Sequence, residues 1–221
     1  MQAITILGYS ENALSLVLET LRALGEKRMI PIIQNIPIET SGKPPYLPAG
    51  MEVTVQVAGE NWHLSTDEQY IFGVLNPEVK KKVFDFFCVQ HKITEQNYID
   101  LVHPSSVISA SVQMKGGCYI EPLTVISPFV QLGFGVTVNR GVTIGHHAVL
   151  EDFVTIGPGV NIAGHTGIGA HTSIGIGAAV FDHIRIGKNS KIGGGSVVTK
   201  DIPDNVVAWG NPCRVIKAIA P

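Results

Sequence analysis

The chain has 221 residues, enough for one large domain or two small ones, each with a core of its own. Only 15% of the residues are charged while 24 are glycine, which indicates many tight turns around a packed interior and argues against a disordered chain. The formal net charge of −2 leaves no basic surplus to neutralise phosphates, so we do not expect nucleic-acid binding.

The first hundred residues alternate between short apolar runs and segments with helical spacing. Strands are expected at 3–7, 29–36, 53–57 and 70–75, and helices at 11–24 and 77–91. Ser10 stands where a helix needs a cap, and Gly25 stands where that helix closes. This order predicts a small βαβ-type domain of incomplete Rossmann character over residues 1–100.

From Val102 onward the sequence follows a different rule, because every sixth residue is aliphatic. A small or β-branched residue stands four positions after these residues, and glycine often follows them directly. The repeat runs through sixteen hexads without a slip. Its aliphatic positions are Val102, Ile108, Met114, Ile120, Ile126, Leu132, Val138, Ile144, Leu150, Ile156, Ile162, Ile168, Ile174, Val180, Ile186 and Ile192.

A period of six fits neither one face of an α-helix nor an alternating strand. It predicts a coil with three flat faces, each face a short strand and each corner a turn, over residues 101–221. Residues eighteen apart then stack at about 4.8 Å, and sixteen hexads make five coils and one further face. The aliphatic residue points inward, and the glycine after it permits a turn with positive φ. A β-sandwich would need hairpin turns and strands of variable length, which this repeat lacks.

These repeats, of the form I-G-x-x-x-[VTSA], resemble those of the hexapeptide-repeat acyltransferases, whose parallel β-helices wind left-handed. The ending Val207-Ala-Trp-Gly-Asn-Pro-Cys-Arg-Val-Ile-Lys217 resembles the closing segment of that family, which lies near its coenzyme A site. With an α/β domain in front, the chain is similar to the sugar-nucleotide and sialic-acid acetyltransferases typified by the bacillosamine and perosamine N-acetyltransferases. The resemblance implies a Rossmann-like domain followed by a left-handed parallel β-helix.

The resemblance also implies the reaction and the assembly. Acetyl-CoA is the expected co-substrate, a sugar or sugar nucleotide is the expected acceptor of an N- or O-acetyl group, and acyl-CoA is expected in the groove between neighbouring chains of a homotrimer. In the resembling subfamily the general base belongs to the hexad I-x-H-[ED]-x-x, which reads Ile144-Gly-His-His-Ala-Val149 here. His146 is therefore the expected base, since a neutral imidazole accepts protons near pH 7, with His147 beside it. The other positions implied are Thr155, Ile176 and Gly194 for acetyl-CoA and Asn139 for the acceptor.

The sequence departs from the family pattern in several places. His147 replaces the carboxylate that follows the base in relatives, and Thr155 replaces a histidine. In the front domain the turn Gly8-Tyr-Ser-Glu-Asn-Ala13 has Ser10 in place of the second glycine of a dinucleotide-binding turn. Gly8, Ser10 and Asn76 are the expected contacts of a sugar nucleotide there, although a purely structural role for this domain stays open.

Two other functions stay open. His147, His165 and His183 are eighteen residues apart, so they should stack at one corner, with His171 on the next face. Some left-handed β-helix trimers of carbonic-anhydrase type bind zinc through interface histidines, but His165 and His171 do not match that spacing, and we expect no metal. The third possibility is an inactive scaffold.

The cysteines and the N-terminus bear on the location of the protein. Cys88, Cys118 and Cys213 have no metal-like spacing, and their odd number argues against a disulfide framework. Residues 1–8 lack a basic region and a cleavable apolar stretch, and no segment approaches the ~20 apolar residues of a membrane span. We therefore expect a cytoplasmic protein.

Overall fold

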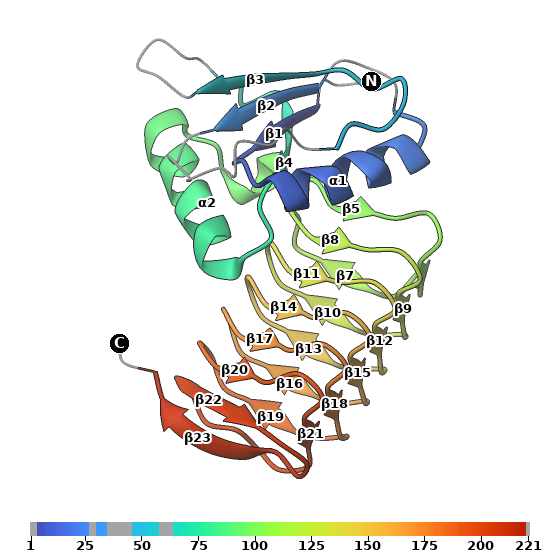
Figure 1. The fold of residues 1–221 in the computed structure, drawn as a ribbon, viewed down its shortest axis with the longest axis vertical. Coiled ribbons are helices and arrows are strands. Elements are labelled where there is room, and N and C mark those ends of the chain that lie inside the picture. Colours follow the sequence, from blue (N-terminus) through green and yellow to red (C-terminus); the bar gives the residue numbers. More distant parts are fainter. Residues whose placement is uncertain (1–3, 27–29, 35–45, 58–63, 220–221) are drawn as a thin grey trace. The chain divides into compact units, whose positions relative to one another are not determined.

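A parallel four-stranded sheet organises the first of the two units into which the chain divides, residues 1–104 and 105–221 (Figure 1). The computed structural model describes residues 4–26, 30–34, 46–57 and 64–219. The sheet order is β3-β2-β1-β4, as expected for a βαβ-type domain. The elements of this unit are β1 (Ile4–Leu7), α1 (Glu11–Ala23), β2 (Ile30–Gln34), β3 (Val53–Val57), β4 (Gln69–Phe72), α2 (Pro77–His91), a 3₁₀ turn (Glu95–Asn97) and β5 (Leu101–Val102).

The two helices of this unit begin differently. Asn76 caps α2, its side chain accepting hydrogen bonds from the N–H groups of Glu78 (3.0 Å) and Val79 (3.2 Å). Ser10 occupies the same position before α1, but its side chain makes no capping hydrogen bond, so the expected serine cap is wrong. Gly25 closes α1 as expected, with φ +85° and its N–H donating to the Arg22 carbonyl (2.9 Å).

Strand β3 is more exposed than its alternating valines suggest. It pairs only with β2 among the described strands, which makes it an edge of the sheet. The side chains of Val55 and Val57 are 47% and 73% exposed. Alternation identified a strand correctly, but it did not reveal that the strand has one neighbour.

From β6 onward the second unit is the expected left-handed parallel β-helix, with short strands in three columns (Figure 1). Face one contains β8 (Tyr119–Ile120), β11 (Thr137–Val138), β14 (Thr155–Ile156), β17 (Ser173–Ile174) and β20 (Lys191–Ile192). Face two contains β6 (Val107–Ile108), β9 (Val125–Ile126), β12 (Thr143–Ile144), β15 (Asn161–Ile162), β18 (Ala179–Val180) and β21 (Val197–Val198). Face three contains β7 (Gln113–Met114), β10 (Gln131–Leu132), β13 (Val149–Leu150), β16 (Gly167–Ile168) and β19 (Arg185–Ile186).

Strands eighteen residues apart pair in parallel, as the repeat predicts. Ile144 on β12, for example, pairs with Ile126 on one side and Ile162 on the other. The run is one hexad longer than expected, because Val198 continues it on β21 and is buried. The coils therefore extend beyond the sixteenth hexad, and β22 (Val206–Trp209) adds a further parallel strand next to β20.

The interior of the β-helix is built from two residues of each hexad. The aliphatic positions from Ile120 to Val198 are buried, and so are the residues four positions later. The latter include Thr172, whose hydroxyl donates to the Gly187 carbonyl of the next coil (2.6 Å). The core is thus a continuous apolar column with hydroxyls satisfied by backbone carbonyls.

The turns use glycine differently from the expectation. Positive φ falls three residues after the aliphatic position, at Gly177 (φ +66°) for example, and not at the glycine directly after it. That glycine is needed for a different reason: a Cβ on Gly157 would lie 2.8 Å from both the Ile174 carbonyl oxygen and the Ile176 nitrogen of the next coil. The expected role of these glycines is therefore wrong, because close stacking of successive turns excludes their side chain.

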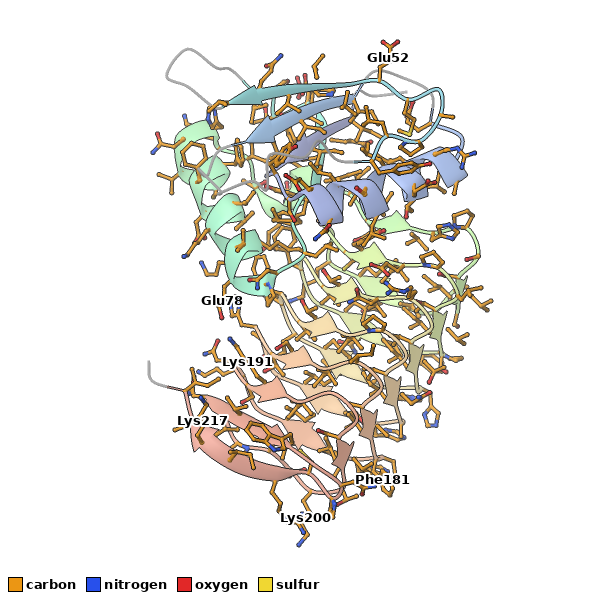
Figure 2. The ribbon with its side chains drawn as sticks, viewed as in Figure 1. Glu52, Glu78, Phe181, Lys191, Lys200 and Lys217 are labelled. Carbon is orange, nitrogen blue, oxygen red and sulfur yellow. The ribbon has the colours of Figure 1, made fainter. Side chains whose placement is uncertain are left out.

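The C-terminal end of the β-helix is closed by an antiparallel pair, β22 and β23 (Arg214–Ala218). Val207 pairs with Lys191 on one side and with Lys217 on the other, so the two lysines belong to one row of face one. Both are exposed on the same side of the unit (Figure 2). In the described part of the chain, neither helix is long and apolar enough to cross a bilayer.

Candidate functional site

The corner between faces two and three, here called the second corner, carries a column of stacked rings. His147, His165 and His183 occupy the same turn position on successive coils, each with φ between 57° and 60°. The His147 and His165 ring centroids are 4.9 Å apart with a 16° interplanar angle, and those of His165 and His183 are 4.7 Å apart at 8°. Phe129 extends the stack, 4.9 Å from His147. The expected column is confirmed, and His171 stacks on Phe153 at a different corner.

His146 lies beside this column and is held by it. Its Nδ1 is 3.0 Å from Nδ1 of His147, so one of the two nitrogens donates a hydrogen bond to the other. Its ring also meets the His165 ring edge-on, at 5.0 Å and 88°. All three imidazoles are exposed, so a bound molecule has access to them.

Gly164, on the next coil, provides the space for the His146 ring. A Cβ at Gly164 would lie 3.0 Å from Cε1 and 3.1 Å from Nε2 of that ring. The backbone at this point is fixed, since the His165 N–H donates to the His146 carbonyl (2.9 Å). Within the described residues, the N–H groups of His146 and Gly164 have no acceptor, so both are available to a ligand.

The electrostatics of the second corner favour a neutral imidazole at His165. The pKa of His165 lies below its usual value, chiefly because neighbouring groups restrict its hydration. Charge repulsion adds to this effect, in decreasing order from His183, His147 and His146. Asp182 acts in the opposite direction. A neutral imidazole keeps a lone pair that can accept a proton or bind a metal.

A cavity of about 520 Å³ adjoins the column on face three, with His147 and His165 at its rim. Arg185 and Lys188 also line it, and no side-chain partner of either cation lies within the described residues. Two carboxylates line it as well, and both accept backbone hydrogen bonds: Glu151 from the Ala170 N–H (2.9 Å) and Asp204 from the Lys188 N–H (2.9 Å). Because the carboxylates are engaged in this way, the two cations are the groups available to an anionic ligand.

The corner between faces one and two, here called the first corner, carries three of the other expected site residues. Asn139 is held there, its amide donating to the Ile156 carbonyl (2.6 Å). Ile176 is 64% exposed and touches the position of Gly194, where a Cβ would lie 3.0 Å from its Cγ2. Thr155 lies on β14 of face one, half-buried. In one chain these residues lie at different corners or faces from His146, so the structure does not bring them together with it.

In the front unit, Gly8, Ser10 and Asn76 lie at the carboxyl ends of the neighbouring strands β1 and β4. Gly8 has φ +89°, but a Cβ there would meet the side chains of Val74 and Val83 (both 3.1 Å), so it packs against the interior. The side-chain oxygen of Asn76 is used for the helix cap. Gly8 and Asn76 therefore each have a structural role, and binding of a sugar nucleotide by Gly8, Ser10 and Asn76 stays a prediction.

Gly164 and His165 are among the residues of this site that the sequence did not predict, as are the cations Arg185 and Lys188 of the cavity. The signal was present in the register, because position 164 lies eighteen residues after His146 and position 165 eighteen after His147. Applying the eighteen-residue stacking rule to His146 and His147 identifies both.

No protein-family model matches the sequence, and no curated protein matches it. Among solved structures, the acetyltransferase domain of PglB from Neisseria gonorrhoeae is 26% identical over 98% of this chain and 100% of that one, with a TM-score of 0.81. The same domain in complex with acetyl coenzyme A is 24% identical over 97% and 99%, with a TM-score of 0.80.

A variant of perosamine N-acetyltransferase from Caulobacter crescentus, solved in complex with CoA and GDP-perosamine, has the same fold. It is 22% identical over 98% of each chain, with a TM-score of 0.78. WeeI from Acinetobacter baumannii is 23% identical over 98% of this chain and 100% of that one, with a TM-score of 0.73. These likenesses extend over both units and confirm the resemblance inferred from the repeats.

Proposed function

We propose that the protein is an acetyl-CoA-dependent acetyltransferase that acetylates an amino or hydroxyl group of a sugar or sugar nucleotide. One observation carries this proposal: in a fold shared with such enzymes, an exposed His146 is held 3.0 Å from His147, on the corner next to a cavity whose two cations have no side-chain partner among the described residues. The side chains of Arg185 and Lys188 are suited to bind the phosphates of a nucleotide sugar or of CoA by charge-assisted hydrogen bonds.

In the proposed reaction His146 acts as general base. It accepts the proton of the acceptor group as that group attacks the thioester carbonyl of acetyl-CoA. The new C–N or C–O bond forms, a tetrahedral intermediate collapses, and the C–S bond breaks. The proton held by His146 then passes to the departing CoA thiolate, which leaves the enzyme in its starting state.

The intermediate carries a negative oxygen that requires hydrogen-bond donors. The N–H of Gly164 is suited to this role, because Gly164 itself lies next to the His146 ring and its N–H has no acceptor within the described residues. The hydrogen bonds between successive coils hold this backbone donor in place, so it does not have to reorient as the negative charge develops. Base and donor thus come from stacked turns eighteen residues apart.

His147 takes the place of the carboxylate that orients the base in related enzymes. Through the contact between the two Nδ1 atoms it can fix the orientation and tautomer of His146. A neutral imidazole stabilises the imidazolium of His146 less than a carboxylate does, so we expect slower turnover than in enzymes with the acidic residue.

Acetyl-CoA is proposed to bind at the first corner of a neighbouring chain. There the N–H groups of Ile176 and Gly194 have no acceptor within the described residues, and Lys191 precedes this turn on β20. Asn139 and Thr155 are proposed to face the same groove. The first and second corners are different edges of the same β-helix, so within one chain they cannot form one site. A complete site therefore needs two chains, and a ring of three chains closes the arrangement.

We therefore predict a homotrimer. Light scattering on a sizing column should give three times the chain mass of 23.7 kDa, with or without acetyl-CoA. A monomer at the enzyme concentrations used for assay would exclude a site shared between chains.

A second prediction concerns Gly164. Gly164→Ala places a methyl group against the His146 ring, which must move, and a displaced base loses rate by up to about a hundredfold. The expected result is a lower kcat for acetyl transfer with a melting temperature lowered by no more than about 4 °C, since the added Cβ also lies 3.2 Å from the His146 carbonyl oxygen. Gly167→Ala is the matched control, since its Cβ meets nothing nearer than Cγ of Arg185 at 3.9 Å. Equal kcat values in both variants would mean that Gly164 does not position the base.

The location and the acceptor complete the proposal. Cys88, Cys118 and Cys213 form no disulfide with one another, as suits the reducing cytoplasm in which we place the protein. The test of function is a thioester-cleavage assay with acetyl-CoA and a panel of UDP-, GDP- and dTDP-amino sugars, preceded by a thermal-shift screen of the same ligands. Stabilisation by acetyl-CoA without turnover of any acceptor would indicate an inactive scaffold.

A further inference from the structure

Three imidazoles of the second corner converge on one point. His146, His147 and His165 each offer a ring nitrogen, and these three atoms lie within 4.8 Å of one another. The stacked column does not by itself bring three nitrogens to one point, so the spacing of its histidines alone predicts no metal site. His146 supplies the third from beside the column, as its edge-on contacts with both rings show.

We propose that the second corner binds one divalent transition-metal ion of the zinc class through His146, His147 and His165. Zinc is bound at about 2.0–2.1 Å by histidine nitrogen, and tetrahedral geometry places three such nitrogens about 3.4 Å apart. The Nδ1 atoms of His146 and His147 are already 3.0 Å apart. A ring nitrogen of His165 already lies within 4.8 Å of ring nitrogens of both, so a small shift of this exposed side chain, without leaving the stack, brings in the third ligand.

The scaffold is suited to hold these ligands. The N–H groups of His147 and His165 donate to the carbonyls of Pro128 (3.1 Å) and His146 (2.9 Å), so the Cα positions of the ligands are fixed by the coils. The stacking of Phe129 on one side and His183 on the other restricts the two column rings. The fourth position faces solvent, which leaves room for an exchangeable water.

Metal binding and the proposed catalysis exclude each other. An ion that takes the lone pair of His146 removes the proton acceptor, so the metal should inhibit acetyl transfer, and chelation should restore it. This part of the inference rests on the proposed function, whereas the binding itself does not.

The test is a calorimetric titration of the trimer, prepared without a polyhistidine tag, with ZnCl₂ in the absence of acetyl-CoA. We expect one ion per chain and a loss of affinity of more than about tenfold in His165→Asn. Asparagine tolerates the positive φ at this position, as Asn189 and Asn205 do at another corner, so the variant should fold. Co²⁺ in place of Zn²⁺ should give the absorption bands of a tetrahedral site in the wild type and lose them in His165→Asn.

His183→Asn is the matched control, because His183 stacks on His165 but does not belong to the three converging ligands. It should keep wild-type affinity. No binding up to about 100 μM Zn²⁺, or equal affinity in wild type and His165→Asn, would overturn the proposed site. If zinc binds as expected but no acceptor is ever acetylated, the metal site stands and the proposed function fails.

Discussion

His146→Ala should lose most of its turnover in acetyl transfer, by the ~10²–10⁴-fold typical of a missing general base. The variant removes the imidazole beyond Cβ, and neither His147 nor His165 can replace it, because the orientation of each ring is set by stacking in the column. The side chain is exposed, so the melting temperature should be unchanged. The measurement is kcat/KM with one acceptor at saturating acetyl-CoA.

His147→Glu provides the complementary variant for that experiment. It restores a carboxylate next to the base, which stabilises the imidazolium formed as the acceptor loses its proton, so kcat should equal or exceed that of the wild type. A glutamate at positive φ is strained, and its thermal stability must be measured alongside. If His146→Ala keeps wild-type activity, His146 is not the base and the proposed mechanism is wrong.

The largest expected effect on stability comes from Gly175→Ala. A Cβ at this position would overlap the Gly194 nitrogen and lie 2.8 Å from the Gly193 carbonyl carbon and the Ile192 oxygen. These are backbone atoms of the next coil, so no change of rotamer relieves the contact and the two coils must separate. We expect a loss of about 3 kcal/mol in the free energy of unfolding and a melting temperature about 10 °C lower.

Gly167→Ala separates this contact from a general effect of replacing glycine. Gly167 also lies in the coils, in a backbone conformation open to alanine, but a Cβ there is free of close contacts. Its melting temperature should stay within about 2 °C of the wild type, since substitutions away from such contacts change stability by less than about 0.5 kcal/mol. Equal destabilisation in both variants would show that contact with the next coil does not decide the requirement for glycine.

The β-helix was predictable because its signal is local and repeated. Each hexad places one aliphatic residue inward, and each coil stacks on the next at a fixed separation of eighteen residues, so the sequence alone determined the faces and the pairing of strands such as β12 and β15. The same arithmetic predicted the stack of His147, His165 and His183. In the front unit the periodicity predicted α2 at its observed bounds, Pro77–His91.

The tertiary structure decided what depends on distances between atoms of neighbouring coils. A repeat shows that glycine is required after the aliphatic residue but not whether the cause is a turn angle or a close contact, and the contact proved to be the cause at Gly157. Likewise, the sequence singled out His146 by resemblance, but a ring's direction depends on its rotamer and on the atoms around it. Only the folded coils show that His146 lies over Gly164, against His147 and His165, because that packing is set across an eighteen-residue step and not along the chain.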